Sequence, residues 1–170
     1  MGLRLKQSDL CYDGRMKVST TSYGLILGLF LSVLIILSNV TFPQDGPDSS
    51  PLMLIATLGI GLYVAWSAYD ATAGENDDNQ VLKVGAITSL LGFSISMLSF
   101  VVIDNLFSRT VSKQADKIYG FLHSSYPSMQ AYINAGLVRG ILVGIPASIA
   151  FGLACGWVAR MIRLHLKHSK

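Results

Sequence analysis

The sequence predicts an all-α fold: an integral membrane bundle of four transmembrane helices, with an amphipathic helix connecting the third and fourth. Three observations predict it. The 170-residue chain is 51% hydrophobic and only 14% charged, whereas soluble domains carry about 25% charged residues. Four apolar stretches each have the length of about 20 residues that crosses a bilayer as a helix. Turn-forming or charged segments separate these stretches, so we expect a single transmembrane domain over residues 23–165.

The first two predicted spans are residues 23–42 and 51–69, preceded by a polar segment, 1–22, that we expect in the cytoplasm. The first span contains Gly24 and Gly28, whose four-residue spacing lets helix backbones approach closely in lipid. A connection rich in proline and aspartate predicts a turn between the spans. After the second span, residues 70–80 are acidic and contain no basic residue. We interpret this segment as a solvated loop, with Asp78 or Asn79 capping the next helix; binding of an ion or a partner stays open.

The third predicted span, residues 84–103, is an uncharged stretch between Lys83 and Asp104. The long connection after it has apolar residues at helical spacing, which predicts an amphipathic helix on the membrane surface or over the end of the bundle. These residues are Phe107, Val111, Ala115, Ile118 and Leu122.

The fourth predicted span, residues 136–160, is the stretch around which we expect the bundle to be organised. It places a small residue at every fourth position: Gly136, Gly140, Gly144, Ser148, Gly152 and Gly156. Each four-residue step turns about 40° around a helix, so this glycine stripe sweeps roughly 200°. One neighbouring helix cannot cover such an arc, so we expect two. A basic tail, 166–170, follows.

The distribution of lysine and arginine predicts the orientation. Nine lie in the terminal segments and the loop between the second and third spans, against four in the connection before the last span and at its start. Because translocated loops are depleted in these residues, we expect both termini in the cytoplasm and an inner or plasma membrane location. Four aromatic residues are then expected at the cytoplasmic interface: Tyr23, Trp66, Tyr69 and Trp157.

The charged residues lie outside the predicted spans or at their edges, whereas proton relays and ion pathways need ionisable groups at membrane depth. We therefore predict that the chain is not an enzyme and has no catalytic residue, cofactor, metal ion or nucleic-acid partner. Asp104 closes the third span and Arg139 opens the fourth. An ion pair between these two residues is our hypothesis for how the two helix ends are held together.

A resemblance to a known family rests on three segments and on the long connection before the last helix. The segments are YGLILGLF (23–30), VLKVGAITSLLGF (81–93) and GLVRGILVGIPASIAFGLA (136–154). Over about residues 23–165 the chain resembles a family of small bacterial four-helix membrane proteins of unknown function. The resemblance implies the same architecture and brings no catalytic residues.

These observations favour a structural or accessory interaction subunit. We expect it to pack through its small-residue helix faces against itself or against a larger membrane complex, surrounded by membrane lipid. A small uncoupled channel or carrier formed by an oligomer is the alternative, with a pore between subunits or along the serines of the third span.

Overall fold

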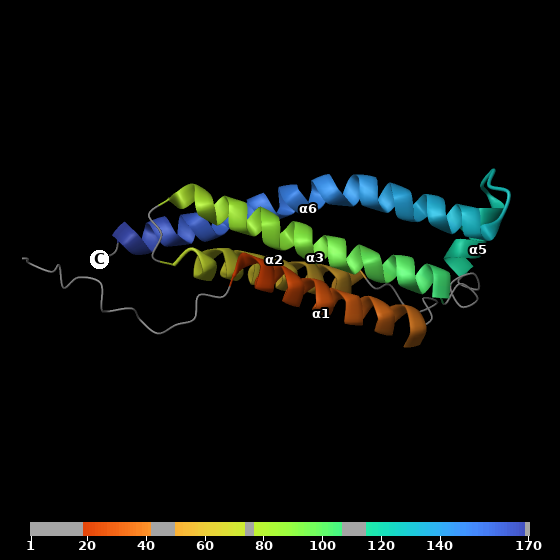
Figure 1. The fold of residues 1–170 in the computed structure, drawn as a ribbon, viewed down its shortest axis with the longest axis horizontal. Helices are drawn as coiled ribbons and strands as arrows, with labels where there is room; N and C mark the ends of the chain where they lie inside the picture. Colours follow the sequence, from red (N-terminus) through yellow and green to blue (C-terminus); the bar gives the residue numbers. More distant parts are fainter. Residues whose placement is uncertain (1–18, 42–49, 74–76, 107–114, 169–170) are drawn as a thin grey trace, which may run out of the picture.

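Four long helices form a bundle in the computed structural model, which describes residues 19–41, 50–73, 77–106 and 115–168. They are α1 (Thr20–Thr41), α2 (Ser50–Ala71), α3 (Asp78–Leu106) and α6 (Met129–His168), and a short helix, α5 (Ala115–Leu122), precedes α6 (Figure 1). Each long helix contains a stretch that is long and apolar enough to cross a membrane. For the described residues this confirms the all-α class and the four candidate spans.

Consecutive long helices run in opposite directions, so the start of α1 and the end of α6 lie at the same end of the bundle (Figure 1). We call this the terminal end, and the opposite one the α5 end. The predicted amphipathic helix is represented by α5 alone, because residues 107–114, with Phe107 and Val111, lie outside the described part. Its amphipathic character stays a prediction.

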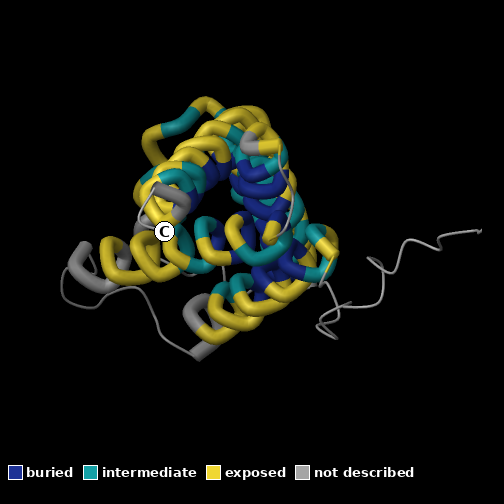
Figure 2. Tube along the Cα trace, turned by 90° about the vertical axis from the view of Figure 1, so that its left-hand side faces the viewer, coloured by how far each residue is buried: buried dark blue, intermediate teal, exposed yellow. Residues whose placement is uncertain are grey.

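α3 is the central helix of the bundle. It packs most extensively along α6 and α1, while α2 lies against α6 and α3 and has little contact with α1. One group of buried residues joins α2, α3 and α6: Ala68, Val81, Val84 and Ala159. Another joins α1, α2 and α6: Leu27, Val64 and Cys155. The buried positions gather where the helices meet, and the outward faces are exposed (Figure 2).

The exposed faces are strongly apolar. Leu62, Leu142 and Val143 are 73%, 68% and 70% exposed. Such a surface would be unfavourable in water over so large an area, whereas it matches the hydrocarbon of a bilayer.

Polar side chains cap the starts of three helices. The backbone N–H of Ser22 donates to Ser19 Oγ (3.2 Å), that of Asn79 to Asp77 Oδ1 (2.9 Å) and that of Ala131 to Ser128 Oγ (3.2 Å). Each bond satisfies a first-turn N–H that has no partner within the helix. Asp77 therefore caps α3, and the expectation that Asp78 or Asn79 would do so is wrong.

The last helix is longer than the predicted span. α6 begins at Met129 rather than Gly136 and ends at His168 rather than Arg160. Arg139 and Arg160 bound the uncharged segment, but the helix continues past both. Its start is set by Ser128, which follows Pro127 and caps the first turn. The 40 residues of α6 span about 60 Å, twice the thickness of about 30 Å of a bilayer hydrocarbon core.

Candidate functional site

The closest approach between helices joins α3 to α6 near the terminal end. A Cβ added at Gly85 would overlap the carbonyl oxygen of Gly152, and one added at Gly152 would lie 2.7 Å from Ala86 Cα. A Cβ at Gly156 would lie 2.9 Å from the carbonyl oxygen of Val81. Because the neighbouring atoms belong to backbone, only glycine fits at these positions.

The contact between α1 and α3 uses glycine in a different way. A Cβ added at Gly24 would lie 2.6 Å from Leu91 Cβ, and one at Gly28 would lie 2.6 Å from Ile95 Cβ. Both glycines of the predicted pair therefore receive a large side chain of α3.

The glycine stripe of α6 divides into two parts. The ring of Phe93 occupies the space where a side chain at Gly144 would lie. Ser148 is buried, and its hydroxyl donates to the carbonyl oxygen of Ile145 (2.8 Å). With Gly152 and Gly156, these positions face the interior of the bundle. An added Cβ at Gly136 or Gly140 would meet no atom within 4 Å. Among the described helices, then, none fills the space where a side chain at Gly136 or Gly140 would lie.

A second row of residues on α6 is exposed along its length. The six positions, here called the exposed α6 face, are Gly136, Gly140, Val143, Ala147, Ala150 and Ala154. They follow alternating steps of four and three residues, 18 residues in five steps. That average equals the 3.6-residue helical repeat, so the row runs straight along the helix. This face is not evident from the sequence, because the small residues at every fourth position form a more regular pattern.

A cleft with a volume of about 290 Å³ lies at the α5 end between α3, α5 and α6. Asp104 is buried in its wall, only 7% exposed, and Lys117 of α5 is close enough to interact with it electrostatically. Arg139 donates to Tyr126 Oη at 3.0 Å. Asp104 and Arg139 thus line one cleft, but the contact found for Arg139 is with Tyr126. The direct ion pair between them stays a prediction.

A crevice of about 300 Å³ lies at the middle of the bundle. Its walls come from all four long helices and include Leu27, Leu31, Ile60, Phe93 and Phe151. Ser96 and Ser148 also line it, but their hydroxyls donate to the carbonyl oxygens of Phe93 and Ile145, each at 2.8 Å. The crevice therefore presents a mainly apolar surface to any occupant.

Polar contacts tie the helices together at the terminal end. Tyr23 is buried, and its hydroxyl donates to Asp70 Oδ2 at 2.5 Å. Tyr23 thus packs between helices, whereas Trp66, Tyr69 and Trp157 are exposed. The position of these four residues at the cytoplasmic interface stays a prediction. Arg163 of α6 is also buried, 9% exposed, and donates to Thr72 Oγ1 (3.4 Å).

Asp70 belongs to the last turn of α2 rather than to the acidic loop. Within the described ranges, no three His, Cys, Asp or Glu side chains gather closely enough to hold a metal ion. Glu75 of that loop lies outside these ranges.

Comparison with protein-family models, with curated proteins and with solved structures gives no match to this chain. The resemblance to small bacterial four-helix membrane proteins therefore stays a prediction.

Proposed function

We propose that this chain is a non-catalytic integral membrane subunit that associates with another transmembrane helix through the exposed α6 face. One observation carries this proposal: five of the six positions of that face are glycine or alanine, and all six are exposed. From Gly140 to Ala154 the face runs along the uncharged segment between Arg139 and Arg160, where we expect the hydrocarbon core.

Small residues have a specific value in lipid. Burying a large apolar side chain against another helix gains little free energy there, because lipid tails are equally apolar. Small residues instead let two helix backbones approach and make van der Waals contact. Other exposed positions of α6 carry large residues suited to acyl chains, such as Leu142, Ile145 and Leu153. The difference between the two faces favours a helix as the neighbour of the exposed α6 face.

The contact between α3 and α6 supports the same idea. There the chain already uses Gly85, Gly152 and Gly156 to bring two of its own helices close together. We infer that the exposed α6 face repeats this mode of packing between molecules, with either a second copy or a subunit of a larger membrane complex. We further infer an inner or plasma membrane location with both termini in the cytoplasm.

The alternative of a channel or carrier receives less support. Three of the four serine hydroxyls of α3 donate to carbonyl oxygens of their own helix: Ser94 to Leu90, Ser96 to Phe93 and Ser99 to Ile95. Such hydroxyls are less available to a passing solute, so the interaction subunit is the function we favour.

The test is the mass of the complex extracted from native membranes in mild detergent. We expect Ala150→Leu and Ala154→Leu to reduce the fraction of chain found in complex, because each leucine holds the partner backbone away. Ala56→Leu is the matched control, since Ala56 is exposed on α2. A wild-type chain that is a strict monomer, or a complex that both α6 variants leave intact, would refute the proposal.

A further inference from the structure

The cleft at the α5 end and the central crevice lie at successive depths along the same two helices. On α6 the cleft is lined by Gly136 and Gly140, and the crevice by Gly144 and Ser148. On α3 the lining passes from Asp104 and Phe100 to Ser96 and Phe93. These positions follow one another at the spacing of helix turns. The cleft and the crevice share no lining residue but follow one another beside the α3–α6 contact, from the α5 end to the middle of the bundle, and together they are here called the groove.

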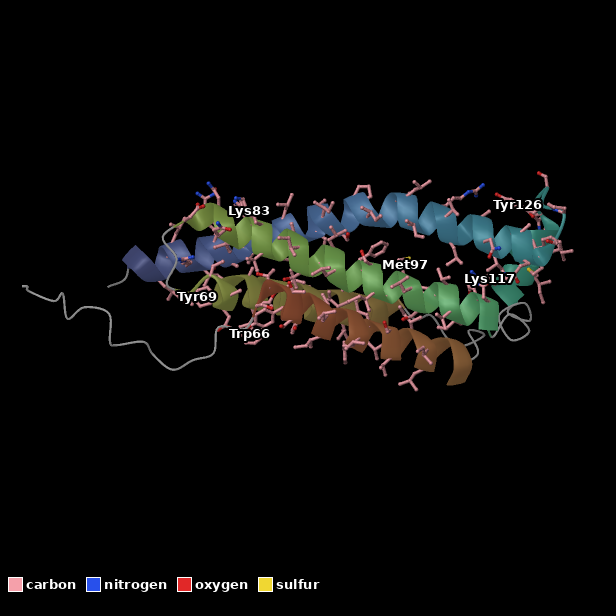
Figure 3. The ribbon with its side chains drawn as sticks, in the orientation of Figure 1. Trp66, Tyr69, Lys83, Met97, Lys117 and Tyr126 are labelled. Atoms are coloured by element: carbon pink, nitrogen blue, oxygen red, sulfur yellow. The ribbon has the colours of Figure 1, made fainter. Side chains whose placement is uncertain are left out.

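The polarity of this groove changes with depth. At the α5 end it presents the charged groups of Lys117, Arg139 and Asp104 with the hydroxyls of Tyr126 and Tyr132. Lys117 and Tyr126 lie at the same end of the bundle, and Met97 lies nearer its middle (Figure 3). The walls of the crevice are mainly apolar. A polar head followed by an apolar tail is the chemistry of a membrane lipid.

The charges favour an anionic headgroup. Asp104 is buried and interacts electrostatically with Lys117, so the positive charge of Lys117 offsets the negative charge of Asp104. Arg139 is exposed and is hydrogen-bonded to the hydroxyl of Tyr126. Since a guanidinium carries five N–H donors, the remaining ones can serve a phosphate. Lys117, Arg139 and Asp104 together leave the cleft with one net positive charge.

The length of the groove matches one acyl chain. Eleven residues separate Gly140 from Phe151, a rise of about 17 Å along the helix, and one leaflet of hydrocarbon is about 15 Å deep. Gly136 and Gly140 have no side chain to close the upper part, and open space surrounds both.

From these observations we propose that the groove binds one anionic phospholipid. Its phosphate lies between Lys117 and Arg139, and one acyl chain passes Gly140 and enters the central crevice. This inference rests on the proposed membrane location. Gly136 and Gly140 belong both to the groove and to the exposed α6 face, so the lipid and a partner helix are alternative neighbours of these two glycines.

Native mass spectrometry of the detergent-extracted protein tests the site, with phosphatidylglycerol and phosphatidylcholine added in equal amounts. We expect the wild type to retain one phosphatidylglycerol in preference. Lys117→Gln and Arg139→Gln should each reduce that preference about fivefold, as the attraction of one basic residue for an anionic membrane surface implies. Lys83→Gln is the matched control, because Lys83 is exposed at the opposite end (Figure 3).

A second variant tests the groove itself. Gly140→Leu adds a side chain where no atom lies within 4 Å, so we expect the fold to persist, with unchanged helical circular dichroism, and binding of both lipids to be lost. Equal retention of the two lipids by the wild type, unchanged preference in the Lys117 and Arg139 variants, or an equal loss in Lys83→Gln would overturn the proposal. Lipid and subunit masses appear as separate increments, so failure of this site is distinguishable from failure of the proposed association.

Discussion

Tyr23 holds two helices together through several contacts at once. Its hydroxyl donates to Asp70, and its backbone carbonyl oxygen accepts from Tyr63 Oη at 3.2 Å. Its ring stacks edge-on against Trp66, with 5.6 Å between ring centroids. These contacts join α1 to α2, a pair that otherwise has little contact. A single residue thus accounts for much of what holds these two helices together.

We predict that Tyr23→Phe lowers the free energy of unfolding by about 1 kcal/mol, because it leaves the ring in place and removes the hydrogen bond to Asp70. Denaturant unfolding in mild detergent measures the change. Tyr69→Phe is the control, since Tyr69 is exposed at the same end of the bundle. A double-mutant cycle with Asp70→Ala isolates the interaction. A coupling energy of zero between the two positions would show that this bond contributes nothing.

At the scale of helices, α3 and α6 are held by shape rather than by charge. The glycines at their contact meet backbone atoms, which cannot rotate out of the way as a flexible side chain can. By contrast, a Cβ added at Gly59 of α2 would meet no atom within 4 Å. The role of a glycine in this chain therefore depends on its neighbour.

We predict that Gly152→Ala destabilises the protein by about 1–3 kcal/mol, the usual cost of overpacking. Gly59→Ala makes the same chemical change in open space, and we expect it to be neutral or to stabilise by up to about 1 kcal/mol through helix propensity. Thermal unfolding followed by circular dichroism compares the two variants. Equal effects at both positions would contradict the tight α3–α6 contact.

At the scale of the whole molecule, the four long helices differ in length. α1 and α2 have 22 residues each, whereas α3 has 29 and α6 has 40. Toward the α5 end, α6 continues past α1 and α2, and α5 lies beside its first turns (Figure 1). The cleft lies between α5, this part of α6 and α3, and the central crevice lies where the four long helices come together.

The antiparallel arrangement and the distribution of basic residues lead to a prediction about topology. We expect both ends of the chain on the cytoplasmic side, because nine lysines and arginines belong to the terminal segments and the connection between the second and third spans, and four to the connection before the last span and its start. A fluorescent reporter that matures only in the cytoplasm should be bright when fused to either terminus. Fluorescence from one fusion alone would contradict the arrangement.

Several features of the fold were predictable because they depend on local sequence. Helices of about 20 apolar residues follow from the need to satisfy every backbone polar group within a bilayer. The breaks between them follow from proline, aspartate and serine. The extent of α6 was not predictable from charge, because Arg139 and Arg160 bound an uncharged segment without ending the helical hydrogen bonding.

The sequence by itself determined that this protein has four apolar helices and that glycine recurs along the first and last of them, because both properties follow from local composition and from the 3.6-residue period of a helix. Only the tertiary structure decided at which glycines a neighbouring helix occupies the space that a side chain would take. Gly152 meets the backbone of α3 whereas Gly140 faces open space, although both belong to one stripe. The path of α3 across α6 makes this difference, and it results from the packing of all the helices together rather than from the residues of α6.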